Sequence, residues 1–78
     1  MHKKIPVYNR IQEVREALGW SRHQLAENLD INVRELGYIE QGKIDIDLAM
    51  SLCIANCLSV AVDHIFSLEP MGPQETLA

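Results

Sequence analysis

The 78-residue chain is poor in the residues that build metal sites, disulfide frameworks and membrane spans. It has two cysteines and three histidines, and His2, His23 and His64 lie far apart in the sequence. Disulfide-stabilised domains use more cysteines, and a zinc site needs several Cys or His ligands at short spacings. No apolar run approaches the roughly 20 residues that a membrane span requires. We therefore expect no metal, no cofactor and no membrane partner.

The chain also lacks the patterns of secreted proteins and of enzymes. Its first residues, from Met1 to Pro6, have no apolar stretch of the kind found in signal peptides, so we expect a cytoplasmic protein. It contains neither a Ser/His/Asp set nor a glycine-rich phosphate loop, so we do not expect an enzyme. Cys53 and Cys57 lie four apart in a segment expected to be helical, and we interpret both as small buried apolar residues.

Charge is unevenly distributed along the sequence. The formal net charge is −4, from 7 basic and 11 acidic residues. All seven basic residues lie within residues 1–43, which hold six acids and therefore sum to +1. Residues 44–78 hold the other five acids and no Lys or Arg, and sum to −5. A polyanion is therefore expected to meet the first half of the chain.

Helix signals follow one another from the beginning of the chain. An apolar stripe at helical spacing predicts a first helix that ends at Gly19. The members of this stripe are Val7, Ile11, Val14 and Leu18.

Two further helix starts follow eleven residues apart. Ser21 and Gln24 have the spacing of a capping box, and Trp20 and Leu25 that of a hydrophobic staple. The same two devices recur in the pairs Asn32–Glu35 and Ile31–Leu36. They predict helices over residues 22–29 and 33–41, joined by a tight turn at Asp30, which is a helix-turn-helix.

The remaining segments predict two more helices and a tail. Asp47 caps a helix over residues 48–57, in which Leu48, Leu52 and Ala55 share a face. A short helix covers residues 61–66, with three apolar residues available for the core, Val62, Ile65 and Phe66. We find no strand-like alternation. The expected organisation is an N-terminal arm over residues 1–8, a domain over 9–66 and a disordered tail over 67–78.

Four segments resemble the lambda-repressor-like helix-turn-helix regulators, also called the XRE or Cro/C1 type. Residues 9–15 are similar to the first helix of that family, and S-R-H-Q-L-A at 21–26 to its S-Q-x-x-L-A pattern. L-G-Y-I-E-Q-G-K at 36–43 resembles I-S-x-I-E-x-G-K, and V-A-V-D-H-I-F at 60–66 resembles V-S-L-D-E-L-F. The resemblance covers residues 9–66 without an insertion. It implies an all-α domain of five helices that binds double-stranded DNA through its third helix.

The resemblance also assigns roles to individual residues. It implies base contacts from the exposed side of the third helix, at Val33, Arg34, Gly37 and Tyr38. It implies phosphate contacts from Arg10, Arg22, Gln41 and Lys43. For Val33, Arg34 and Tyr38 the alternative role is ordinary helix surface. Arg15 and Glu40 match an ion pair that links the first and third helices in several members, the alternative being two solvated charges.

We expect the family's usual homodimer on a pseudo-palindromic operator, and a transcriptional regulator of the repressor type. The expected dimer surface comprises Val60, Val62, His64, Ile65 and Leu68. The alternative to the dimer is a monomer whose last helix closes the core. The alternative function is a protein-interaction module on the same fold, an antitoxin or anti-regulator with weak or no DNA binding, which the net charge and the acids Asp45 and Asp47 favour.

Overall fold

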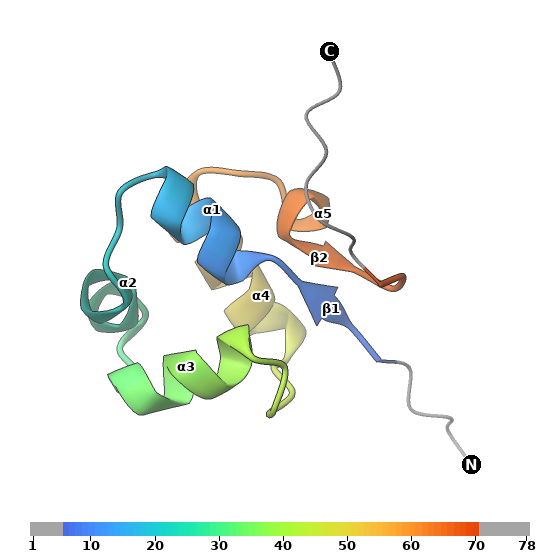
Figure 1. Cartoon of the computed structure of the whole chain (residues 1–78), viewed down its shortest axis with the longest axis horizontal. Helices are drawn as coiled ribbons and strands as arrows, with labels where there is room; N and C mark the ends of the chain where they lie inside the picture. Colours follow the sequence, from blue (N-terminus) through green and yellow to red (C-terminus); the bar gives the residue numbers. More distant parts are fainter. Residues whose placement is uncertain (1–5, 71–78) are drawn as a thin grey trace.

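The computed structural model describes residues 6–70, which form five helices and one pair of short strands (Figure 1). The helices are α1 (Ile11–Ala17), α2 (Arg22–Leu29), α3 (Val33–Glu40), α4 (Leu48–Leu58) and α5 (Val62–Ile65). The strands are β1 (Tyr8–Asn9) and β2 (Phe66–Ser67). The predicted five-helix fold is confirmed. Residues 1–5 of the expected arm and 71–78 of the expected tail lie outside the described residues.

The starts of α2 and α3 follow from the capping residues before them. Ser21 Oγ accepts a hydrogen bond from the Gln24 amide at 3.1 Å, and Gln24 Oε1 accepts one from the Ser21 amide at 2.8 Å. Asn32 Oδ1 accepts one from the Glu35 amide at 2.7 Å. The capping box is therefore complete at α2, whereas at α3 only the Asn32 half forms among the described residues.

The turn between these helices is tight because Asp30 adopts a left-handed conformation, with φ of 58°. Asp tolerates this region better than most residues with a Cβ. The chain reverses there, and the Ile31 amide donates to the carbonyl of Ala26 at 3.1 Å. The predicted helix-turn-helix is thus present, with α3 starting three residues after Asp30.

One apolar core joins the five helices. Each helix contributes at least one buried side chain, and the set is Ile11, Val14, Leu25, Ala26, Leu36, Ile39, Ile54, Ala55, Leu58 and Ile65. Trp20 and Ile31, the predicted staple residues, pack partly buried against it. Because Leu36 and Ile39 fix the inner side of α3, the opposite side of this helix faces outward.

The prediction that Val7 belongs to the first helix is wrong. Val7 precedes β1 and is 56% exposed, and α1 begins at Ile11, whose amide donates to Asn9 Oδ1 at 3.0 Å. The residues before Ile11 instead pair antiparallel with β2, Tyr8 opposite Ser67 and Asn9 opposite Phe66. A pairing across almost 60 residues leaves no periodic signal in two-residue strands, so the sequence did not predict it.

The face of α4 that carries Leu48, Leu52 and Ala55 is buried only at Ala55. Leu48 is 71% exposed and Leu52 48% exposed, whereas the buried residues are Ile54, Ala55 and Leu58. Apolar residues occupy every side of this helix and no charge marks its outer side, so spacing alone did not identify the buried face.

The two cysteines of α4 differ in burial, which corrects the prediction that both are buried. Both are free thiols; Cys53 is exposed and Cys57 is half-buried. Burial raises the pKa of the Cys57 thiol, and the neighbouring Cys53 adds to this rise.

Among residues 6–70, every helix is too short or too polar to span a membrane.

Candidate nucleic-acid interface

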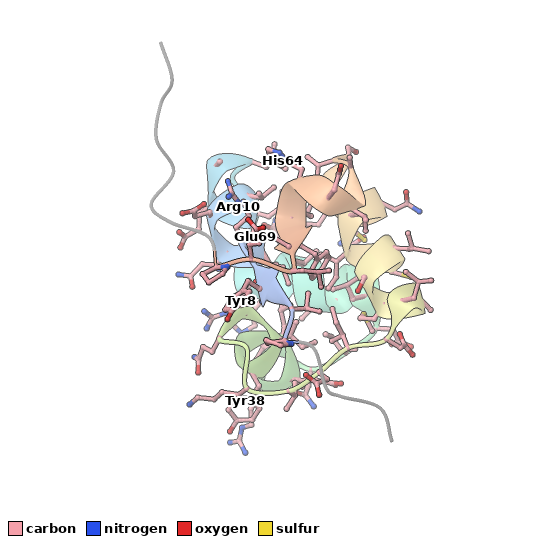
Figure 2. All side chains as sticks on the ribbon, turned by 90° about the vertical axis from the view of Figure 1, so that its right-hand side faces the viewer. Tyr8, Arg10, Tyr38, His64 and Glu69 are labelled. Atoms are coloured by element: carbon pink, nitrogen blue, oxygen red, sulfur yellow. The ribbon has the colours of Figure 1, made fainter. Side chains whose placement is uncertain are left out.

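The outer side of α3 presents Arg34 and Tyr38 to solvent. Arg34 is exposed and Tyr38 is 40% exposed, while Leu36 and Ile39 on the opposite side are 0% and 2% exposed. Figure 2 shows Tyr38 projecting from one end of the molecule. Lys43 Nζ lies 5.8 Å from the centroid of the Tyr38 ring, which brings a second positive charge to this surface. Val33, at the start of α3, is half-buried.

Gly37 is placed differently from the other predicted base contacts. It is buried, and a Cβ added to it would lie 3.8 Å from Arg22 Nη1 and 4.0 Å from Arg22 Cδ. Its open side therefore faces α2 and is covered by the Arg22 side chain. The structure does not leave Gly37 accessible to a base edge, in contrast to the prediction.

Replacing Gly37 with alanine is expected to raise the free energy of unfolding by up to about 1 kcal/mol, because glycine is a poor residue inside a helix. The added methyl group would meet Arg22 at ordinary contact distance. Chemical denaturation monitored by circular dichroism measures the change. Gly19→Ala is the matched control and is expected to destabilise, because Gly19 has φ of +79°. A destabilised Gly37→Ala protein would mean that the Arg22 side chain cannot accommodate the added methyl group.

A buried carboxylate holds three helices together. The predicted ion pair is present: Arg15 Nε donates to Glu40 Oε2 at 2.7 Å, and Arg15 Nη1 donates to the Trp20 carbonyl at 2.9 Å. The side chains of Arg15 and Glu40 are only 6% and 0% exposed. Arg22 Nε also donates to Glu40, to Oε1 at 2.9 Å. Sequence reasoning missed this second pair because it assigned Arg22 only to phosphate binding.

The predicted phosphate contacts fall into two groups. Gln41 and Lys43 are exposed just after α3, and Arg22 stands at the first position of α2 with its side chain 37% exposed. Arg10 lies elsewhere: its amide donates to the carbonyl of Ile65 at 2.9 Å. Figure 2 shows Arg10 with His64 and Glu69 at the opposite end of the molecule from Tyr38. The structure therefore does not bring Arg10 to the α3 surface.

The end of α3 is tied to β1 by a residue that sequence reasoning did not assign to the site. Asn9 Nδ2 donates to the carbonyl of Ile39 at 3.0 Å, while Asn9 Oδ1 accepts from the Ile11 amide. This side chain thus joins the start of α1 to the last turn of α3. The sequence carried no local signal for it, because Asn9 and Ile39 are 30 residues apart.

The predicted dimer residues are not equally accessible. His64 and Leu68 are exposed, and Val60 and Val62 are half-buried. Ile65 is 0% exposed and belongs to the core, so its side chain cannot contribute to an interface. The structure does not leave Ile65 available as a surface residue, because it is the last residue of the four-residue α5 and its side chain packs into the core.

Comparisons with known proteins place this arrangement in a family. Residues 11–65, more than half of the chain, match the helix-turn-helix family. The chain is also similar to the solved structure of the restriction-modification controller protein C.AhdI from Aeromonas hydrophila, with a TM-score of 0.64 and 26% identity. That match covers 68% of this chain and 80% of the other. A search of curated proteins gives no match. The chain therefore belongs to the lambda-repressor-like helix-turn-helix family of DNA-binding transcription regulators.

Proposed function

We propose that this protein recognises a specific double-stranded DNA sequence by inserting α3 into the major groove, and that it acts as a repressor. The observation that carries the proposal is the exposure of Arg34 on a helix whose opposite side is locked into the core. A guanidinium can donate two hydrogen bonds to O6 and N7 of guanine, which is the commonest specific contact in the major groove. In this arrangement Tyr38 and Val33 would contact neighbouring bases, Val33 through a thymine methyl group.

The positions of three proposed phosphate-binding residues around α3 support this orientation. Arg22 lies at the start of α2, and Gln41 and Lys43 follow the end of α3. Contacts of this kind position a protein on the duplex, whereas base contacts specify the site. Contacts to the DNA backbone from residues on two sides of α3 would hold Arg34 over the base edges.

A homodimer would extend the contact to a pseudo-palindromic operator. Two copies of α3 separated by one helical turn, roughly 34 Å, would read two half-sites. His64 and Leu68 are the accessible members of the proposed dimer surface, with partial contributions from Val60 and Val62. A dimer seated on a promoter excludes other proteins from the same DNA, which is the physical basis for proposing a repressor.

Arg34→Ala tests the recognition role. A site is first selected from random duplex DNA with the wild-type protein, and binding to this site and to a scrambled duplex is then measured by fluorescence anisotropy. Each lost guanine contact is expected to cost about 1–3 kcal/mol of discrimination, while the melting temperature stays close to that of wild type.

Arg10→Ala is the matched control, because it removes the same charge at the far end of the molecule from Tyr38. It is expected to keep the ratio of specific to scrambled binding. If Arg34→Ala also keeps this ratio, α3 does not read bases through Arg34.

One observation favours a second candidate function, a protein-interaction module. Leu48 and Leu52 are both exposed on α4, in a part of the helix that carries no charged residue. Large exposed apolar side chains that adjoin one another are typical of interaction surfaces. The net charge of −4 is in keeping with this alternative. The salt dependence of DNA binding separates the two functions, because only DNA binding weakens as salt is added.

A further inference from the structure

The carboxylate of Glu40 is shared by two arginines from different helices. Its Oε2 accepts a hydrogen bond from Arg15 Nε at 2.7 Å, and its Oε1 accepts one from Arg22 Nε at 2.9 Å. The Glu40 side chain is 0% exposed. We call Arg15, Glu40 and Arg22 the Arg–Glu–Arg cluster. Because two guanidinium charges face one carboxylate, this cluster carries an excess of one positive charge.

The two arginines of the cluster differ in how many of their donors are used. Arg15 is 6% exposed, and its Nη1 donates to the Trp20 carbonyl at 2.9 Å. Arg22 has a hydrogen-bond acceptor only at Nε among the described residues, and 37% of its side chain is exposed. A guanidinium carries five N–H donors in one planar fork. The four outer donors of Arg22 are therefore available to a further anion.

The position of Arg22 indicates that this anion is a DNA phosphate. Arg22 is the first residue of α2, where unpaired amides and the helix dipole favour a negative charge. The capping box uses the amides of Ser21 and Gln24, so that those of Arg22 and His23 have no acceptor within residues 6–70. The Arg22 side chain also covers Gly37 on α3. Its outer donors thus lie where α2 begins beside the proposed recognition helix.

We propose that Arg22 is a two-ended contact: Nε holds Glu40 while Nη1 and Nη2 bind a DNA phosphate, and Glu40 is the positioning residue for this contact. The inference rests on the proposed DNA binding. A phosphate at Arg22 completes an alternating row of charges that runs from Arg15 through Glu40 and Arg22 to the DNA. Phosphate binding is thereby coupled to the packing of α1, α2 and α3 against one another.

The phosphate contact is tested through the salt dependence of binding to a short mixed-sequence duplex. Phosphate contacts supply nonspecific binding, so the operator need not be known. Arg22→Gln is expected to reduce the slope of log K against log salt by about 0.9 for each bound protomer, and to weaken binding roughly tenfold at low salt. Arg22→Lys, which keeps the charge, is the matched control and is expected to keep the slope.

The positioning role of Glu40 is tested in an Arg15→Met/Glu40→Met background. Both charges are removed together, because removing one alone would leave the other buried without a partner. Thermal melting confirms that the double variant is folded before DNA is added. Without Glu40, Nε no longer fixes the guanidinium, and the affinity loss caused by Arg22→Gln is expected to shrink to about threefold or less.

The outcomes separate this inference from the proposed function. If the wild-type protein does not bind the duplex at low salt, the proposed function itself fails. If it binds and Arg22→Gln leaves the slope unchanged, Arg22 does not contact a phosphate. If Arg22→Gln weakens binding equally in both backgrounds, Arg22 acts without Glu40 and the positioning role is wrong.

A measurement on the wild-type protein covers the case in which the double variant does not fold. The NMR resonance of the Arg22 Nε–Hε group is expected to persist and to stay protected from solvent exchange when the duplex is bound. Loss of this protection on binding would mean that Arg22 leaves Glu40 to reach the phosphate, and would overturn the two-ended contact.

Discussion

Replacing Glu40 with alanine is expected to lower the free energy of unfolding by about 3–5 kcal/mol. The substitution leaves Arg15, only 6% exposed, without the carboxylate 2.7 Å from its Nε, and it also removes the acceptor of Arg22. A small domain has a total stability of roughly 5–15 kcal/mol, so this variant should be close to unfolding at room temperature. Urea denaturation followed by circular dichroism measures the change.

Glu16→Ala is the matched control for this substitution. Glu16 Oε2 lies 4.0 Å from Arg15 Nη2, but the Glu16 side chain is 59% exposed, so its loss is expected to cost under about 1 kcal/mol. The Arg15→Met/Glu40→Met protein should recover most of the stability that Glu40→Ala loses, because it contains no uncompensated buried charge. A Glu40→Ala protein as stable as the Glu16→Ala protein would show that solvent reaches the pair and screens it.

Much of the helix-turn-helix was predictable because its signals are local. The capping residues Ser21 and Asn32 act on amides three positions away, and Asp30 determines the turn through its own backbone conformation. Such interactions are complete within a few residues and therefore leave a pattern in the sequence. The family resemblance added the Arg15–Glu40 pair, which no local pattern could have supplied.

Contacts between distant residues decided the features that sequence reasoning missed. The Arg22–Glu40 pair spans 18 residues, and it depends on how α2 and α3 cross. The same crossing places Gly37 beneath Arg22 instead of toward the groove. In α4 the difficulty was of another kind: with apolar residues on all sides, only the packing of the other helices determines that Ile54 is buried and Leu48 is exposed.

Raising the salt concentration from about 50 to about 200 mM is expected to weaken operator binding on the order of 10²- to 10³-fold. Each protomer presents three basic residues on the proposed DNA-facing side, Arg22, Arg34 and Lys43. For a dimer, the slope of log K against log salt is expected to be about −4 if only Arg22 and Lys43 neutralise phosphates, and about −5 if Arg34 also does so, since each neutralised phosphate contributes about −0.9. Fluorescence anisotropy on the selected site at several salt concentrations measures the slope.

The sign of this salt dependence shows whether DNA binding is controlled by the basic residues at the interface or by the net charge of the whole chain. A chain with a net charge of −4 is repelled by DNA when it is treated as a single charge, and salt would then strengthen the interaction by screening the repulsion. Salt should instead weaken binding, because the proposed contacts place Arg22 and Lys43 directly against phosphates, and each such contact releases counterions from the DNA. Lys43→Gln is therefore expected to reduce the slope by about 0.9 per protomer, whereas Asp63→Asn, at an exposed position of α5, should leave it unchanged. Absence of binding at low salt, or binding that does not respond to salt, would instead favour the protein-interaction module.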